Sequence, residues 1–275
     1  MKKTILLFVL ILGLVLSFAA CGGGGSGSSD ITTVRVGVVG EFNDHWDTIN
    51  ELLEEEGIRV ELVRFSDFAT PNRALSDGDL DLNAFQHKMF LASEIQSQGY
   101  EIEYFADTFV VPISIFSGND EITSVADIRD GHVIAIPSDP TNGGRSLQLL
   151  EVAGLITLHN APGEHPTIFD VEYIVEIDIR EAEAVLLPAL LPDVDAAVIG
   201  GINAFTAGLR PIEDSFFRED VTGAAHLVNV IAARSEDLAN PERRAIFDAI
   251  ARAHHTDLVR DNMLRDFGGA FIPVW

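Results

Sequence analysis

Cysteine and lysine are nearly absent from this sequence of 275 residues. Cys21 is the only cysteine, so the chain cannot form an internal disulfide. Basic residues are also few, because 18 Lys and Arg stand against 43 Asp and Glu and give a formal net charge of −25 at pH 7. A surface this acidic repels the phosphates of nucleic acids and anionic lipid headgroups. We therefore exclude nucleic acid as a partner, and solubility is a sufficient explanation of the acidic surface.

The sequence also lacks the common signatures of catalytic and metal sites. Neither the GxSxG motif of serine hydrolases nor the HExxH motif of zinc hydrolases occurs. The acidic stretch "DGDLDLN" at 77–83 has Leu82 and Lys88 where a calcium loop of the EF-hand type needs Gly and Glu. The adjacent histidines of "AHH" at 253–255 would face different sides of a helix. We expect no catalytic residues, no metal site and no cofactor.

The N-terminus has the features of a secretory signal. Met1, Lys2 and Lys3 precede the apolar run "TILLFVLILGLVLSFAA", which ends at Cys21. A basic start, an apolar stretch and small residues before a break are typical of a signal peptide. An uncleaved transmembrane anchor needs ~20 apolar residues, and this run is only slightly shorter, so its length leaves both interpretations open.

The residues around Cys21 favour the signal peptide. Residues 18–21, "FAAC", resemble a bacterial lipobox, in which the cysteine is diacylated and becomes the new N-terminus, although Leu is usual where Phe18 stands. The tract "GGGGSGSSD" that follows has the composition of a flexible tether. We expect a signal peptide at 1–20, a lipid on Cys21, a tether at 21–30, and a domain held at the outer face of the cell membrane. A lipidated Cys21 leaves the mature chain no thiol for catalysis.

Short segments rich in Val and Ile alternate with segments of helical spacing over the rest of the chain. Two of the helical segments, 47–57 and 144–154, end in Gly, which is a common helix stop. Strands that alternate with helices of this length predict an α/β fold with parallel sheets covered on both faces. The expected strands are 34–40, 58–65, 132–137, 171–177, 195–200 and 227–234.

Two extended stretches interrupt this alternation and predict two lobes. The stretch "FVVPISIFSGND" at 109–120 is apolar and carries a Pro, and "HLVNVIAARSED" at 226–237 precedes the final helices. We interpret them as two strands that cross between the lobes. Lobe 1 would comprise residues 31–110 plus 232–275, and lobe 2 would comprise residues 111–231. Lobes joined in this way can close over a ligand by a hinge motion.

The segment "AIPSDPTNGGRSLQLL" at 135–150 predicts an anion site. It passes from an apolar stretch through a loop into a helix, so several backbone N–H groups and the positive helix end point the same way. A nucleotide loop would need GxxxxGK followed by Ser or Thr, which this segment lacks. The guanidinium of Arg145 at the helix start suits a carboxylate held through two parallel N–H bonds. The alternative is that Asp139 and Asn142 cap the helix and Arg145 makes only a surface ion pair.

Three longer blocks resemble the methionine-binding lipoproteins of bacterial ABC importers. They are "FSDFATPNRALSDGDLDLNAFQH" at 65–87, "IPSDPTNGGRSLQLLEVAGLI" at 136–156 and "DVDAAVIGGINAFTAGL" at 193–209, and the similarity extends to the closing "GGAFIPVW". The resemblance implies a two-lobed periplasmic-binding-protein fold of type II. It also implies a substrate receptor that serves a membrane permease and its ATPase. We expect this receptor to be a monomer.

The resemblance assigns the principal ligand contacts residue by residue. Arg145 would hold the carboxylate of an amino acid, and Asn142 in the same loop is included among the ligand-binding residues. Phe68, Phe85 and Phe90 match aromatic positions that enclose the methionine side chain, since a thioether sulfur favours aromatic rings. Simple core packing is the alternative for these three rings.

Three further positions complete the expected pocket. His87 matches a histidine that lines the pocket, although a lone histidine is more often structural. Asn229 matches an asparagine that points into the cleft from the second crossing strand. Gly200 stands where the family has an asparagine, so a side-chain donor to the ligand backbone is missing. Asn203 is close enough in sequence to replace that donor after a local shift.

The aromatic positions also depart from the family, because Tyr is common where Phe68 and Phe90 stand here. One net hydrogen bond contributes ~0.5–1.5 kcal/mol, so the loss of three donors would weaken methionine binding by about two or more orders of magnitude. We expect a lipid-anchored receptor that binds methionine or a related compound in the cleft between the lobes. The alternatives are a different amino acid, a short peptide or a sensor without a transport role, and an extracytoplasmic hydrolase has the least support.

Overall fold

The computed structural model describes residues 31–41, 43–268 and 270–275. The expected signal peptide, tether and lipidated cysteine lie outside these ranges. The chain from Thr32 to Trp275 forms one folded unit. Within the described ranges, no helix has the length and apolar character needed to span a lipid bilayer.

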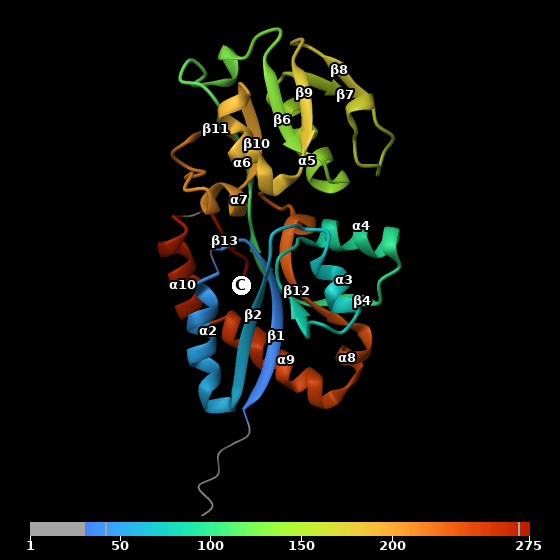
Figure 1. Cartoon of the computed structure of the whole chain (residues 1–275), viewed down its shortest axis with the longest axis vertical. Coiled ribbons are helices and arrows are strands. Elements are labelled where there is room, and N and C mark those ends of the chain that lie inside the picture. The colour runs from blue at the N-terminus through green and yellow to red at the C-terminus, as the bar shows by residue number, and fades with distance from the viewer. Residues whose placement is uncertain (1–30, 42, 269) are drawn as a thin grey trace, which may run out of the picture. The chain divides into compact units, whose positions relative to one another are not determined.

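A six-stranded mixed sheet forms the first half of this unit (Figure 1). Its strands follow the order β13-β4-β12-β3-β1-β2. Strand β1 is parallel to β2 and β3, whereas β12 is antiparallel to β3 and β4. The bounds are β1 Thr32–Val39, β2 Ile58–Phe65, β3 Leu82–Asn83, β4 Ile102–Val110, β12 Val228–Arg234 and β13 Ile272–Pro273.

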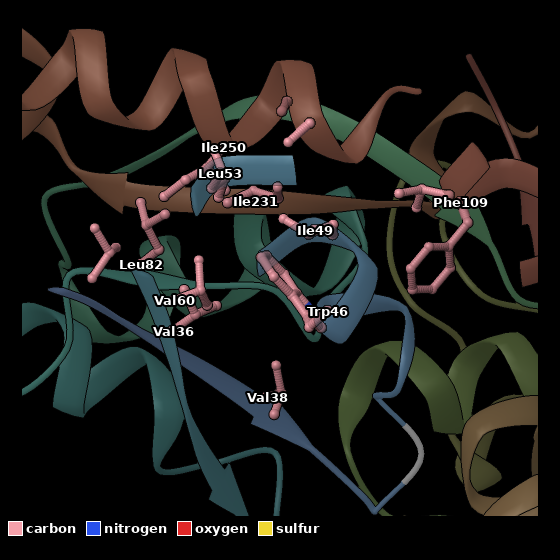
Figure 2. Packing of buried hydrophobic residues seen from close by; sticks show 14 of the residues in the cluster. Val36, Val38, Trp46, Ile49, Leu53, Val60, Leu82, Phe109, Ile231 and Ile250 are labelled. Carbon is pink, nitrogen blue, oxygen red and sulfur yellow. The ribbon is translucent and has the colours of Figure 1, made fainter. Parts of the chain in front are cut away.

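Helices α2 and α9 pack against this sheet and close its main core. Figure 2 shows Trp46, Ile49 and Leu53 of α2 beside Ile250 of α9 and the strand residue Val36, all of which are buried. Burial of each such side chain contributes about 1.5–3 kcal/mol. The helices of this half are α2 His45–Leu53, α3 Pro71–Ser76, α4 Lys88–Gln98, α8 Ser235–Ala239, α9 Pro241–His254 and α10 Asp257–Asp266, with the 3-10 helix η1 Glu54–Glu56.

A five-stranded sheet forms the second half, with the order β11-β5-β10-β6-β9. Strand β10 is parallel to β6 and antiparallel to β5, and β6 is parallel to β9. The bounds are β5 Ile113–Ser117, β6 Val133–Pro137, β9 Asp178–Ala182, β10 Ala196–Gly200 and β11 Ser215–Arg218, with a separate antiparallel pair of β7 Ile156–Leu158 and β8 Val171–Tyr173. The helices are α5 Pro140–Val152, α6 Leu187–Leu190 and α7 Gly201–Thr206, with the 3-10 helices η2 Val125–Asp127, η3 Ile168–Asp170, η4 Ala184–Leu186, η5 Leu191–Asp193 and η6 Ala225–Leu227.

Two segments of the described chain connect the two sheets. Val111 and Pro112 lead from β4 into β5, and residues 219–227 lead from β11 into β12. The predicted α/β class is therefore confirmed. The strand expected at 171–177 is wrong in its second half, because β8 ends at Tyr173 and the chain then turns into β9, which begins at Asp178. Strand β9 is an edge strand with mostly charged or exposed residues, so it lacks the apolar run that marks the other strands.

Candidate functional site

All eight residues predicted to bind a ligand line one cavity. From the side of the six-stranded sheet come Phe68, Phe85, His87, Phe90 and Asn229, and from the side of the five-stranded sheet come Asn142, Arg145 and Gly200. The crossing residue Val111 also lines the cavity. The cavity therefore lies between the two halves of the folded unit, close to the first segment that connects the two sheets.

The three phenylalanine rings contact one another at the apolar end of the cavity. The ring centroids of Phe68 and Phe85 are 6.1 Å apart with an interplanar angle of 20°, and the ring of Phe90 meets both at 6.0–6.2 Å edge to face. Phe85 and Phe90 are buried, and Phe68 is half-buried. The rings pack with Val39 and Val185 in one hydrophobic cluster. This wall suits an apolar or thioether group of a ligand.

A buried network of side-chain amides holds the segment that carries Phe85 and His87. Asn72 Nδ2 donates to Gln86 Oε1 at 2.8 Å, and Gln86 Nε2 donates back to Asn72 Oδ1 at 2.6 Å. Asn83 Nδ2 donates to the same Asn72 oxygen at 2.8 Å. All three amide side chains are buried out of reach of water, so they depend on one another for their hydrogen bonds. Sequence reasoning missed this network, although amides within the apolar stretch "LNAFQ" are the signal that points to it.

His87 joins the two sides of the cavity as a neutral imidazole. Its Nδ1 accepts a hydrogen bond from Phe90 N at 3.0 Å and thereby caps α4, and its Nε2 lies 3.2 Å from Asn142 Oδ1. Burial, followed by the nearby charge of Arg145, lowers the pKa of His87 to about 3. Because Nδ1 is an acceptor, Nε2 carries the proton and donates a hydrogen bond to Asn142 Oδ1. Both ring nitrogens are thus engaged, which leaves His87 unavailable as a general base.

The first turn of α5 is closed by its own cap. Asp139 Oδ1 accepts from Asn142 N at 2.8 Å and from Asn142 Nδ2 at 3.1 Å, and Pro140 takes the first helical position. Gly143 is needed here, because a Cβ at that position would lie 2.8 Å from the carbonyl oxygen of Pro137. The sequence left open that Asp139 and Asn142 cap the helix, and the structure shows Asp139 in this role. This turn places Arg145 on the side of α5 that faces the cavity.

Arg145 is buried and is paired with a carboxylate that sequence reasoning missed. Its Nε donates to Glu219 Oε1 at 2.7 Å, and its Nη2 donates to Glu219 Oε2 and to the carbonyl oxygen of Val111, the latter at 2.9 Å. Among the described residues, Nη1 has no hydrogen-bond partner, and the side chain is 5% exposed. The ion pair of the alternative is thus present, but it lies at the cavity instead of on the surface. No local signal could reveal this pair, because the two residues are 74 positions apart.

The cavity has open space beside Gly200. Gly200 precedes α7 with φ −67° and ψ 142°, and a Cβ built on it meets no heavy atom within 4 Å. Asn203 lines the cavity and donates from Nδ2 to the carbonyl oxygen of Ala184 at 3.0 Å. The backbone carbonyl of Asn229 accepts from Thr108 Oγ1 at 2.9 Å, while its side-chain amide has no partner among the described residues. The side chain of Asn229 is therefore available to a ligand.

The lining of the cavity offers contacts for binding and no nucleophile. Among the described residues that line it there is no Ser, Thr, Cys, Lys, Asp or Glu. Within the same described ranges, no group of three or more His, Cys, Asp and Glu side chains could hold a metal ion. The lining presents the free N–H groups of Arg145 Nη1, the free side-chain amide of Asn229 and three aromatic rings.

Comparisons with known proteins match nearly all of the described chain. The family model of the NlpA lipoproteins matches residues 34–275. The "D-methionine-binding lipoprotein MetQ" of Salmonella typhimurium is 38% identical over 269 residues, which is 96% of this chain and 96% of that protein.

Two solved structures have closely similar folds. The substrate-binding protein of a methionine transporter from Streptococcus pneumoniae is 33% identical, with a TM-score of 0.84 over 88% of this chain and 96% of that chain. A nutrient-binding protein from Burkholderia cenocepacia bound to methionine is 33% identical, with a TM-score of 0.81 over 88% of this chain and all of that chain. These likenesses confirm the two-lobed periplasmic-binding-protein fold that the sequence predicts.

Proposed function

The chain belongs to the NlpA lipoprotein family, and we propose that it is the solute-binding protein of an ABC importer, anchored by lipid at the extracytoplasmic face of the cell membrane. The observation that supports this role is the cavity between the two lobes, whose lining combines one guanidinium, asparagine amides and three aromatic rings without a nucleophile. Such a lining binds a small amphipathic solute and releases it unchanged.

We propose an amino acid, methionine or a related compound, as the solute. The carboxylate of the ligand would accept from the Nη1 group of Arg145, and its apolar side chain would lie against Phe68, Phe85 and Phe90. The amide of Asn229 and the groups around Gly200 would serve the amino end. His87 and Asn142 would close the cavity through the hydrogen bond that already joins them.

The partners follow from the role of an importer receptor. We propose that the lipid on Cys21 holds the protein at the membrane after removal of residues 1–20, with 21–30 as a tether. The receptor would act as a monomer and deliver its solute to a permease driven by an ATPase. We propose lobes of 31–110 plus 232–275 and of 111–231. The end of β4 at Val110 supports the first limit, and the pairing of β12 with β4 from Val228 supports a second junction slightly earlier than 231.

A second candidate ligand class is supported by the space at Gly200. Because a Cβ at Gly200 would meet nothing within 4 Å, the cavity is open beside the groups proposed for the amino end. A larger amino acid or the C-terminal residue of a short peptide would use this space. Screening both classes against the same protein separates the two candidates.

Thermal unfolding of the full chain in detergent, with and without added solutes, tests the proposal. A ligand that binds only the folded state adds a stability of RT ln(1 + [L]/Kd), or about 2.7 kcal/mol when its concentration is a hundred times Kd. We expect L-methionine to raise the unfolding temperature of the native chain and to leave that of Arg145→Met/Glu219→Gln unchanged. The double variant avoids an unpaired buried charge. An absence of any shift with amino acids and short peptides would contradict the proposed function.

A further inference from the structure

Arg145 is the single charged side chain among the described residues that line the cavity, and its charge is already balanced. Glu219 accepts from both Nε and Nη2, so the guanidinium makes a two-point contact with a carboxylate of the protein itself. Both side chains are well shielded, with 5% and 14% of their surfaces exposed. His87 is neutral, as its lowered pKa indicates. The residues that line the cavity, taken together with Glu219, therefore carry no net charge when no ligand is bound.

The same ion pair joins the two segments that connect the lobes. The carbonyl of Val111, in the first connection, accepts from Nη2 of Arg145 at 2.9 Å. Ile113 N donates to Glu219 Oε2 at 3.2 Å, and Glu219 N donates to Ile113 O at 3.0 Å. Glu219 opens the second connection, and its carboxylate accepts three N–H groups, one from Ile113 at the start of β5 and two from Arg145 of α5. This geometry fixes the side chain of Glu219 and with it the orientation of Arg145.

We propose that Glu219 is a specificity-determining residue, which balances the charge of Arg145, leaves only Nη1 for the ligand, and so selects solutes without net charge over anions. The proposal rests on the proposed function, since it concerns the solute of that same cavity. An amino acid zwitterion brings one carboxylate and one ammonium and leaves the site neutral. A solute that brings a carboxylate alone gives the buried site a net negative charge, which is costly where water is excluded.

Three probes of nearly equal size separate charge from shape. L-Methionine carries no net charge, 4-(methylthio)butanoate lacks the ammonium and carries one negative charge, and L-methioninamide lacks the carboxylate and carries one positive charge. Their affinities are measured by isothermal titration on the full chain in detergent. In the native protein we expect methionine to bind more tightly than either analogue.

The Glu219→Gln variant removes the charge and keeps the size of the side chain. Arg145 then has no counterion, and the site gains one positive charge. We expect the affinity of the anionic 4-(methylthio)butanoate, relative to that of methionine, to rise by about tenfold or more. The exposed Glu213→Gln is the matched control, because it removes the same charge from the surface, and it leaves the ratio unchanged. An unchanged ratio in Glu219→Gln, with methionine still bound by the native chain, would overturn the inference and leave the proposed function intact.

A double-mutant cycle on the ligand-free protein supplies a readout that does not depend on the ligand. Unfolding is measured for the native chain, Glu219→Gln, Arg145→Met and the double variant. We expect each single variant to lower the unfolding temperature, because each leaves a buried charge without its counterion, and the double variant to recover part of the loss. If none of the three probes binds, the methionine proposal fails, and the cycle still decides whether Glu219 is the counterion of Arg145. Additive effects of the two substitutions would overturn the inference on their own.

Discussion

The two walls of the cavity differ in the kind of group that they present. The wall from the six-stranded half consists of packed rings on a segment that the Asn72, Asn83 and Gln86 amides hold from behind. The wall from the five-stranded half carries the charge of Arg145 and the open space at Gly200. The first wall is fixed before a ligand arrives, which suits recognition of a side chain by shape. The second presents Nη1 of Arg145 and open space, which, together with the free amide of Asn229 on the first wall, suit recognition of the charged end.

The largest effect is expected when the aromatic wall is removed. Phe85→Ala deletes a buried ring that contacts both Phe68 and Phe90. We expect a loss of about 3–5 kcal/mol in unfolding free energy and a marked loss of methionine affinity, measured by urea unfolding and by titration. Phe169→Ala is the control, since Phe169 is 91% exposed, and its unfolding free energy stays within about 0.5 kcal/mol of native. Equal effects of the two substitutions would show that the ring cluster does not build the wall.

Acid is expected to lower the free energy of unfolding, because two buried histidines are neutral in the folded protein. Burial lowers the pKa of His45 to about 4 and that of His87 to about 3, whereas unfolded histidines titrate near 6.5. The unfolded chain therefore binds more protons between about pH 6.5 and 4, so these residues lower the unfolding free energy as pH falls through that window. Each contributes about 1.4 kcal/mol for every pH unit in the window.

A histidine replacement isolates this contribution. His45→Gln removes one buried imidazole, so the slope of unfolding free energy against pH between 6.5 and 4 becomes smaller. His165→Gln, which removes an imidazole at an exposed position, is the control. Urea unfolding at four pH values in this range gives both slopes. A native slope in His45→Gln would contradict the assignment of a buried neutral imidazole.

A smaller effect is expected from the amide network behind the aromatic wall. Asn72→Ala leaves Gln86 and Asn83 without their common partner. Gln86 Nε2 keeps its bond to Asn83 Oδ1 at 3.1 Å, so we expect a total loss of about 1–3 kcal/mol in unfolding free energy, and the Phe85 to His87 segment loses its support. We expect lower stability and weaker methionine binding, with Gln96→Ala as the control that removes an amide at an exposed position. Lower stability with unchanged affinity would show that the network supports the fold and not the wall.

The smallest effect is expected at the open end of the cavity. Gly200→Asn places an amide where a Cβ meets no atom within 4 Å, in a backbone conformation that any residue adopts. One new hydrogen bond contributes about 1 kcal/mol, so we expect methionine to bind roughly fivefold more tightly. Gly201→Asn is the contrasting variant, because its Cβ would lie 2.6 Å from Val111 Cγ1 and disturb the site. No gain at Gly200 would favour the larger solute.

Local features of the sequence predicted the parts of the site that depend on neighbouring residues. The Asp139 cap, Pro140 and the glycines after it specify the start of α5, and so Arg145 could be placed at a helix start. The helix expected at 144–154 nevertheless begins earlier, at Pro140, because proline is well suited to the first helical turn. The aromatic positions were identified through the family resemblance and not through spacing, since three phenylalanines in an apolar stretch equally predict core.

Pairs of residues that are far apart in the chain could not be predicted from the sequence. Glu219 stands in an exposed and acidic stretch, where nothing distinguishes it from its neighbour Asp220 until the fold brings it to Arg145. The reciprocal bonds of Asn72 and Gln86 span 14 positions and depend on how α3 packs against β3. Strand β9 was missed because an edge strand has one side free of a neighbouring strand and needs no continuous apolar run. In each case the missing information is the tertiary contact.

A crystal structure of the protein grown with L-methionine tests the central claim most directly. The account predicts one methionine in the cavity, with a carboxylate oxygen within hydrogen-bond distance of Arg145 Nη1 and the thioether against Phe68, Phe85 and Phe90. Glu219 would remain paired with the other two guanidinium nitrogens. An empty cavity at saturating methionine, or a ligand whose carboxylate lies away from Arg145, would contradict it.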